Sequence, residues 1–78
     1  MLFIYTEHAI HKLKERLIDK KLVEFVLQNP DITVDSKFDR KIAQKFIEDK
    51  LLRVVFQKEN NVYKIITAYY TKSKRYGE

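Results

Sequence analysis

The spacing of apolar residues changes at Asn29-Pro30, and this change constrains the fold more than any other feature of the sequence. Before Pro30 apolar residues recur at helical intervals, whereas after it β-branched and aromatic residues form short runs. A helix should end there, because proline lacks the N–H that a helix interior needs and favours extended backbone in the preceding residue. We therefore expect an α+β fold with its helices in the first part of the chain.

Two helices are expected before Pro30. Thr6 is a suitable N-cap for a helix over Glu7–Leu17, and Asp19 is a second N-cap for a helix that ends at Asn29. The apolar residues expected to face the core are Ala9, Ile10, Leu13 and Leu17 in the first helix, and Leu22, Val23, Val26 and Leu27 in the second. The apolar run Leu2–Tyr5 precedes both helices and has strand character.

Strands are expected after Pro30, in the runs Ile32–Val34, Leu51–Phe56 and Val62–Tyr70. The polar Glu59-Asn60-Asn61 segment is expected to join the last two as an antiparallel hairpin. The segment Arg40–Glu48 fits a helix face as well as a strand, and nothing local decides. We favour a strand, because an extended segment there completes an antiparallel meander.

The expected architecture has the order β-α-α-β-β-β-β, with a two-helix layer packed on one face of a mainly antiparallel sheet of four to five strands. With 78 residues the chain is short enough for one domain, 1–78, with a flexible basic tail over 72–78. The other face of the sheet is expected to be open or covered by a partner.

Composition excludes several classes of site. The chain has no Cys, one Gly and two His, so we expect no disulfide framework, thiol nucleophile, phosphate-binding glycine loop, metal or cofactor. The formal charge is +5, and most of the excess follows Pro30. Lys72, Lys74 and Arg75 lie beside Tyr76 near the C-terminus, a mixture that suits an anionic partner such as RNA or an acidic protein, although solubilising charge alone explains it as well. No signal peptide or membrane span is apparent, so we expect a cytoplasmic location.

His8, Lys12 and Arg16 are spaced four apart on the first expected helix and form a row beside its apolar stripe. A histidine near neutral pKa can act as general acid or base, and the two cations could hold a phosphate. The alternative is that His8 only belongs to the first turn and that Arg16 pairs with Glu15 or a backbone carbonyl.

Arg53 interrupts the apolar run Leu51–Phe56, and Thr67 and Tyr69 lie two apart on one face of the last strand. Because a charge in so apolar a strand is costly unless it is paired or faces an open surface, Arg53 is a candidate phosphate ligand or transition-state stabiliser. An edge-strand or solvent-face position explains it equally well.

These residue types suit metal-independent RNA cleavage. The 2′-hydroxyl of the substrate attacks the adjacent phosphate, so the protein needs no nucleophile of its own and supplies only proton transfer and charge.

Short motifs along the chain, from Thr6-Glu7-His8-Ala9 and Glu15-Arg16 to Asn29-Pro30, Leu52-Arg53-Val54-Val55 and Ile66-Thr67-Ala68-Tyr69, together resemble the family known as domain of unknown function 4258. Lys12 stands where the family pattern has Arg, and Leu17 where Gly often follows the second arginine. Lysine keeps the charge but lacks the planar fork that binds phosphate through two donors.

The element order of this family is similar to that of RelE/ParE-like toxins and, more broadly, to the barnase and RelE ribonucleases. The resemblance implies a metal-independent ribonuclease toxin neutralised by a small antitoxin. The candidates it implies are His8, Arg16, Arg53, Thr67 and Tyr69. We expect His8 and Tyr69 to transfer protons, Arg16 and Arg53 to bind phosphate with Lys12 as a further substrate-binding residue, and Thr67 to orient the phosphate. The alternatives are a non-catalytic RNA- or protein-binding module and a ParE-like toxin that acts on a protein.

Overall fold

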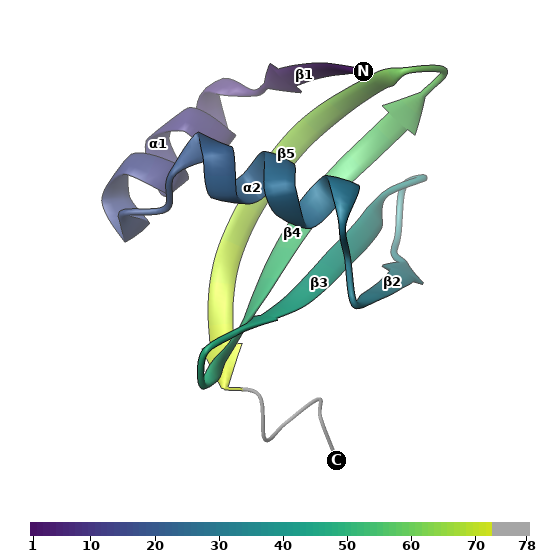
Figure 1. Ribbon diagram of the computed structural model, residues 1–78. Coiled ribbons are helices and arrows are strands. Elements are labelled where there is room, and N and C mark those ends of the chain that lie inside the picture. The colour runs from purple at the N-terminus through teal and green to yellow at the C-terminus, as the bar shows by residue number, and fades with distance from the viewer. Residues whose placement is uncertain (73–78) are drawn as a thin grey trace.

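The chain forms a five-stranded mixed sheet with two helices on one face (Figure 1). The structure is a computed structural model, and it describes residues 1–72. In chain order the elements are β1 (Leu2–Tyr5), α1 (Glu7–Arg16), α2 (Lys20–Gln28), β2 (Ile32–Asp35), β3 (Lys41–Ile47), β4 (Lys50–Glu59) and β5 (Val62–Lys72). The predicted fold class and element order are confirmed. The predicted basic tail, with Lys74, Arg75 and Tyr76, lies outside the described residues apart from Lys72.

The strands lie in the order β1-β5-β4-β3-β2. β2 to β5 form an antiparallel meander, and β1 pairs in parallel with the first part of β5, from Val62 to Ile65. The ambiguous segment 40–48 contains β3, because it pairs with β2 on one side and with β4 on the other. These lateral hydrogen bonds decide between two local structures that the apolar pattern alone fits equally well.

The helices begin at the predicted N-caps. Thr6 Oγ1 accepts a hydrogen bond from the N–H of Ala9, and Asp19 Oδ1 accepts one from the N–H of Lys21. α1 lies against β5, whereas α2 crosses β3 and β4 (Figure 1). No helix among residues 1–72 is long and apolar enough to cross a membrane.

The end of α1 differs from the prediction. Leu17 has φ 57°, in the left-handed region, and the N–H of Ile18 bonds back to the carbonyl of Leu13. This helix-ending motif turns Ile18 into the core, where it is 4% exposed, and leaves Leu17 91% exposed. The expectation that Ile10 and Leu17 face the core is therefore wrong, since Ile10 is also substantially exposed. The buried side chains between helices and sheet include Ala9, Leu13, Ile18, Val23, Val26, Leu27, Leu52, Val54 and Ile65.

A β-bulge in β5 determines which side chains face away from the helices. Phe56 pairs with Ile65 and Val55 pairs with Thr67, so Ile66 is an extra residue in the ladder. Ile65 and Ala68 consequently both belong to the core although they are three residues apart. Thr67 is thereby turned to the opposite face of the sheet, and Tyr69 follows it by alternation.

Candidate functional site

The face of the sheet opposite the helices, here called the open face, carries the candidate residues. Arg53 of β4 pairs in register with Tyr69 of β5 on one side and with Gln44 of β3 on the other. Val55 and Thr67 form the next row of the same face. The strand register therefore places a cation, a phenol and a hydroxyl from distant parts of the sequence on one surface.

Arg53 and Tyr69 are in direct contact. Arg53 Nη1 donates a hydrogen bond of 2.9 Å to the hydroxyl of Tyr69, and the Arg53 guanidinium carbon lies 5.5 Å from the centroid of that ring. Because the Tyr69 oxygen accepts this bond, its own proton points elsewhere and can be donated to a ligand. Both side chains are half-buried, which fixes their positions and weakens the screening of charge by water.

Arg16 reaches the same tyrosine from the helix layer. β1 pairs with Val62–Ile65, and within residues 1–72 no strand covers the edge of β5 beyond Ile65. Around this edge, Arg16 Nη1 donates 2.8 Å to the carbonyl of Ala68 and 3.3 Å to Thr67 Oγ1. Its guanidinium carbon lies 6.0 Å from the centroid of the Tyr69 ring.

The guanidinium groups of Arg16 and Arg53 thus both lie near the ring of Tyr69. We call Arg16, Arg53, Thr67 and Tyr69 the arginine–tyrosine cluster. Arg16 forms no ion pair with any carboxylate among residues 1–72, so its charge is available to an anion. Arginine suits phosphate because its planar fork of donors matches two phosphate oxygens.

His8 and Lys12 lie apart from this cluster. His8 is exposed in the first turn of α1, about 12 Å along the helix axis from Arg16, and forms no hydrogen bond or ion pair with another described residue. Lys12 Nζ lies 3.2 Å from Glu15 Oε1, and this contact holds the pKa of Glu15 below its usual value. Four of the six predicted site residues are therefore brought together, and these two are not.

Gln44 is a neighbour that the sequence reasoning missed. It is only 5% exposed, and its Oε1 accepts no hydrogen bond from the residues that the structure describes. Gln44 pairs with Arg53 in the strand register, so this buried acceptor lies next to Arg53. The available signal was a polar residue inside the apolar run Ile42–Ile47.

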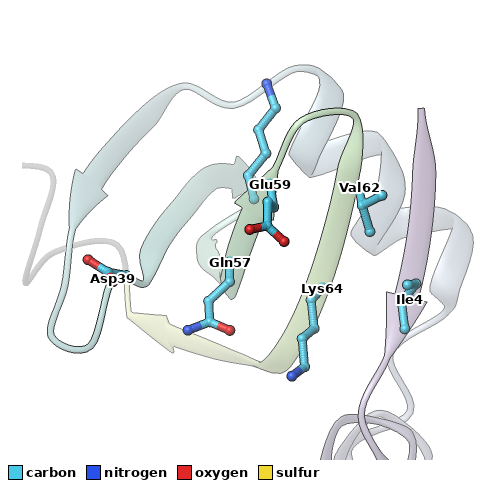
Figure 2. A pocket seen from close by; sticks show the side chains of 7 residues that line it. Ile4, Asp39, Gln57, Glu59, Val62 and Lys64 are labelled. Carbon is cyan, nitrogen blue, oxygen red and sulfur yellow. The ribbon is translucent and has the colours of Figure 1, made fainter.

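A cavity of about 660 Å³ lies farther along the open face, at the β4–β5 hairpin (Figure 2). It was also missed, although Gln57 and Glu59 alternate outward from β4 as strand residues do. Acidic, amide, basic and apolar groups all line it, among them Ile4, Asp39, Gln57, Glu59, Val62 and Lys64. No three His, Asp or Glu side chains within residues 1–72 are grouped closely enough to hold a metal ion.

The model of a family described as a domain of unknown function, DUF4258, matches residues 5–70. No match was found among curated proteins or among solved structures. The matched segment includes every member of the arginine–tyrosine cluster, and it agrees with the resemblance seen in the short motifs.

Proposed function

The chain belongs to the DUF4258 family, and we propose, from the chemistry of its own residues, that it is a metal-independent endoribonuclease of the RelE type. The observation that carries the proposal is the contact of Arg16 and Arg53 with the same tyrosine, Tyr69. Two fixed cations beside a proton donor are the groups that cleavage of a phosphodiester requires when no metal takes part.

The cluster would bind the phosphate before the chemistry begins. Arg16 uses only Nη1 for its contacts with Thr67 and Ala68, which leaves Nη2 and Nε to donate to a phosphate oxygen. Arg53 holds the Tyr69 hydroxyl through its hydrogen bond, and the Thr67 hydroxyl lies beside Arg16. An extended RNA strand lying across the open face would bring one phosphate between the two guanidinium groups.

Cleavage then follows from the substrate's own hydroxyl. The 2′-oxygen forms a bond to phosphorus and loses its proton to water, the bond from phosphorus to the 5′-oxygen breaks, and Tyr69 donates its proton to that oxygen. The products are a 2′,3′-cyclic phosphate and a 5′-hydroxyl, and Tyr69 regains its proton from solvent. Arg16 and Arg53 stabilise the extra negative charge on the pentacovalent intermediate, where fixed donors have the greatest effect.

The RelE assignment is supported by the element order and by the family resemblance, and it includes a small antitoxin as partner. Apolar side chains on and around the open face remain partly exposed, among them Ile4, Ile32, Val34 and Phe46. Together with the basic cluster, such a surface suits an acidic, amphipathic segment. Toxicity on expression, relieved by a neighbouring acidic gene product, would be the corresponding biological result.

A second function, RNA binding without cleavage, is favoured by one observation. The cluster contains no histidine or carboxylate that could remove the 2′-proton, since His8 lies in the first turn of α1. In this second function Arg16, Arg53 and Tyr69 bind phosphate, and the RNA is not cleaved.

One experiment separates the two functions. Purified protein is incubated with a labelled single-stranded RNA in EDTA, and cleavage and binding are measured in the same samples. The ribonuclease proposal expects 2′,3′-cyclic phosphate ends, a loss of about 100-fold in rate for Tyr69→Phe and Arg53→Ala, and little change for Lys14→Ala, the control on the exposed side of α1. Salt-sensitive binding without cleavage supports the second function, and neither binding nor cleavage rejects both.

His8→Ala tests the role that the sequence assigned to His8. A rate within about twofold of the wild type is expected if Tyr69 and solvent transfer the protons, whereas a loss of 100-fold or more would restore His8 as general acid or base.

A further inference from the structure

The cavity at the β4–β5 hairpin has the features of a base-binding site, and we propose that it binds an unpaired guanine of the RNA strand. The inference rests on the proposed function, because it assumes that RNA lies across the open face. It adds a ligand to a part of the surface that the arginine–tyrosine cluster does not reach.

Strand register builds the cavity from three adjacent strands. Ile4 of β1 pairs with Lys64 of β5, and Lys64 pairs with Gln57 of β4, so these three side chains form one row of the open face. Glu59 and Val62 form the next row toward the hairpin end. Figure 2 shows that these side chains project from the same side of the sheet around a common space.

Gln57 is held in one orientation. Its Nε2 donates a hydrogen bond of 3.0 Å to the carbonyl oxygen of Phe38, in the turn that joins β2 to β3. The amide oxygen must then point the other way, and Figure 2 shows it on the side of Lys64, with the nitrogen on the side of Asp39. The cavity therefore has an acceptor whose position is set before a ligand arrives.

The turn that holds Gln57 is itself strained. Phe38 and Asp39 both have left-handed backbone, with φ 59° and 57°, and the N–H of Arg40 closes the turn on the carbonyl of Lys37. Glycine and asparagine are the usual residues in such turns, and an aromatic residue there is unfavourable. The strained turn brings the Phe38 carbonyl to Gln57 and places Asp39 at the border of the cavity.

Two acidic and two basic residues line the cavity, Asp39, Lys58, Glu59 and Lys64, and none of them forms an ion pair within the described part of the chain. Glu59 and Lys64 lie on neighbouring strands and line the same space. A ligand that fits must offer hydrogen-bond donors to a carboxylate and an acceptor to an ammonium group. Ile4 and Val62 give the lining an apolar part on which a flat ring can lie.

Among the four RNA bases, guanine fits this set best. Its Watson–Crick edge presents two adjacent donors, N1–H and the N2 amino group, which one carboxylate accepts together, and beside them the acceptor O6. Glu59 would accept the two donors and Lys64 would donate to O6, while Gln57 Oε1 remains for a further donor. Single-stranded RNA is recognised in this way, through the exposed edges of unstacked bases.

The position of the cavity agrees with a strand that also reaches Tyr69. Gln57 and Arg53 are four residues apart on β4, about 13 Å along the strand, and their side chains face the same side. A short oligonucleotide spans that distance, so the guanine would be a near neighbour of the phosphate bound by the cluster.

The test uses the four nucleoside 3′-monophosphates, titrated into isotopically labelled protein and followed by amide chemical shifts. Guanosine monophosphate is expected to bind about tenfold more tightly than the other three, with shifts at Gln57, Glu59 and Lys64. Glu59→Gln is expected to remove the preference. Glu48→Gln, a matched change in the β3–β4 turn at the other end of β4, is expected to keep it.

Equal affinity for all four nucleotides, or a guanine preference that survives in Glu59→Gln, would overturn the proposal. The titration is repeated with Arg53→Ala, which removes a member of the cluster and should keep the guanine preference, because Arg53 lies about 13 Å from Gln57 along β4. If the wild-type protein cleaves RNA but binds all four nucleotides equally, the base site alone is rejected. A preference for guanine without RNA cleavage or binding at the cluster rejects the proposed function and leaves the base site standing.

Discussion

Arg16 Nη1 lies 2.8 Å from the carbonyl oxygen of Ala68, a residue 52 positions later in the chain. This contact gives a hydrogen-bond partner to the edge of β5 beyond the end of β1, and it anchors the last turn of α1 to the sheet. The same side chain approaches Tyr69. Arg16 therefore has a structural role that exists without any ligand, and tests of its function must measure stability as well.

Replacing Arg16 with alanine should lower the free energy of unfolding by about 1–2 kcal/mol, because a charged hydrogen bond to the Ala68 carbonyl is lost. Chemical denaturation, read by circular dichroism, measures this change. Lys14→Ala in the same turn should change stability by less than about 0.5 kcal/mol. An equal effect of the two substitutions would show that the Ala68 contact contributes nothing specific.

Leu17→Gly should stabilise the protein by about 1 kcal/mol. Leu17 has φ 57° and is 91% exposed, so glycine relieves the cost of left-handed backbone and loses almost no packing. Thermal unfolding measures the gain, and Leu17→Ala, which keeps the Cβ, is the control. A stability equal to or below that of the wild type would contradict the assigned conformation of the helix end.

The carboxylate of Asp31 should make stability depend on pH in the acid range. A hydrogen bond from the N–H of Phe46 and the nearby Lys45 lower the pKa of Asp31 below its ordinary value of 3.8. Since the folded state favours the charged form, this stabilisation is complete above that value and is lost as the pH falls through the lower pKa of the folded state.

Asp31→Asn should therefore unfold at lower denaturant concentration than the wild type at pH 7, and the difference should shrink below about pH 4. Denaturation curves over a pH series measure it. Asp35→Asn, a change at an exposed carboxylate at the other end of β2, is the comparison. A constant difference for Asp31→Asn at every pH would reject the assigned cause.

Gln44→Leu should raise stability by about 1 kcal/mol, because it removes a buried oxygen that accepts no hydrogen bond within residues 1–72. Gln28→Leu, at an exposed position of α2, should have almost no effect. If Gln44→Leu also lowers RNA binding while it stabilises the fold, the unused acceptor belongs to the ligand site.

Arg53→Ala should reduce the dependence of RNA affinity on salt. A residue that contacts one phosphate contributes about 0.7 to the slope of log affinity against log salt for a single strand, so the slope should fall by about that amount. Lys41→Ala, whose side chain pairs with Asp35, should leave it nearly unchanged. An unaltered slope in Arg53→Ala would show that Arg53 does not contact a phosphate of the RNA.

The elements of this fold could be predicted because their signals are local. Thr6 and Asp19 cap the helices through their own side chains, Pro30 ends the helical part, and Asn60 takes the left-handed backbone, φ 57°, expected of the β4–β5 turn. The end of α1 was not predicted, because the left-handed position at Leu17 is usually occupied by glycine or asparagine and here holds a leucine.

The candidate site could be predicted only in part. Residue type and alternation identified Arg53, Thr67 and Tyr69, and helical spacing identified Arg16, but spacing alone also grouped His8 and Lys12 with it. A row along one helix extends over about 12 Å, whereas the cluster forms where the end of α1 passes the edge of β5 beyond Ile65.

Caps, turns and apolar periods act over a few residues, so the elements, their order and the residue types available for chemistry follow from the amino-acid sequence. Which of these residues lie in contact depends on how the strands and helices pack. The bulge at Ile66 turns Thr67 and Tyr69 away from the helices, and the register sets Tyr69 opposite Arg53. Both depend on how β5 aligns with β1 and β4 under a shared core, and such an alignment is a balance of contacts between residues far apart in the chain.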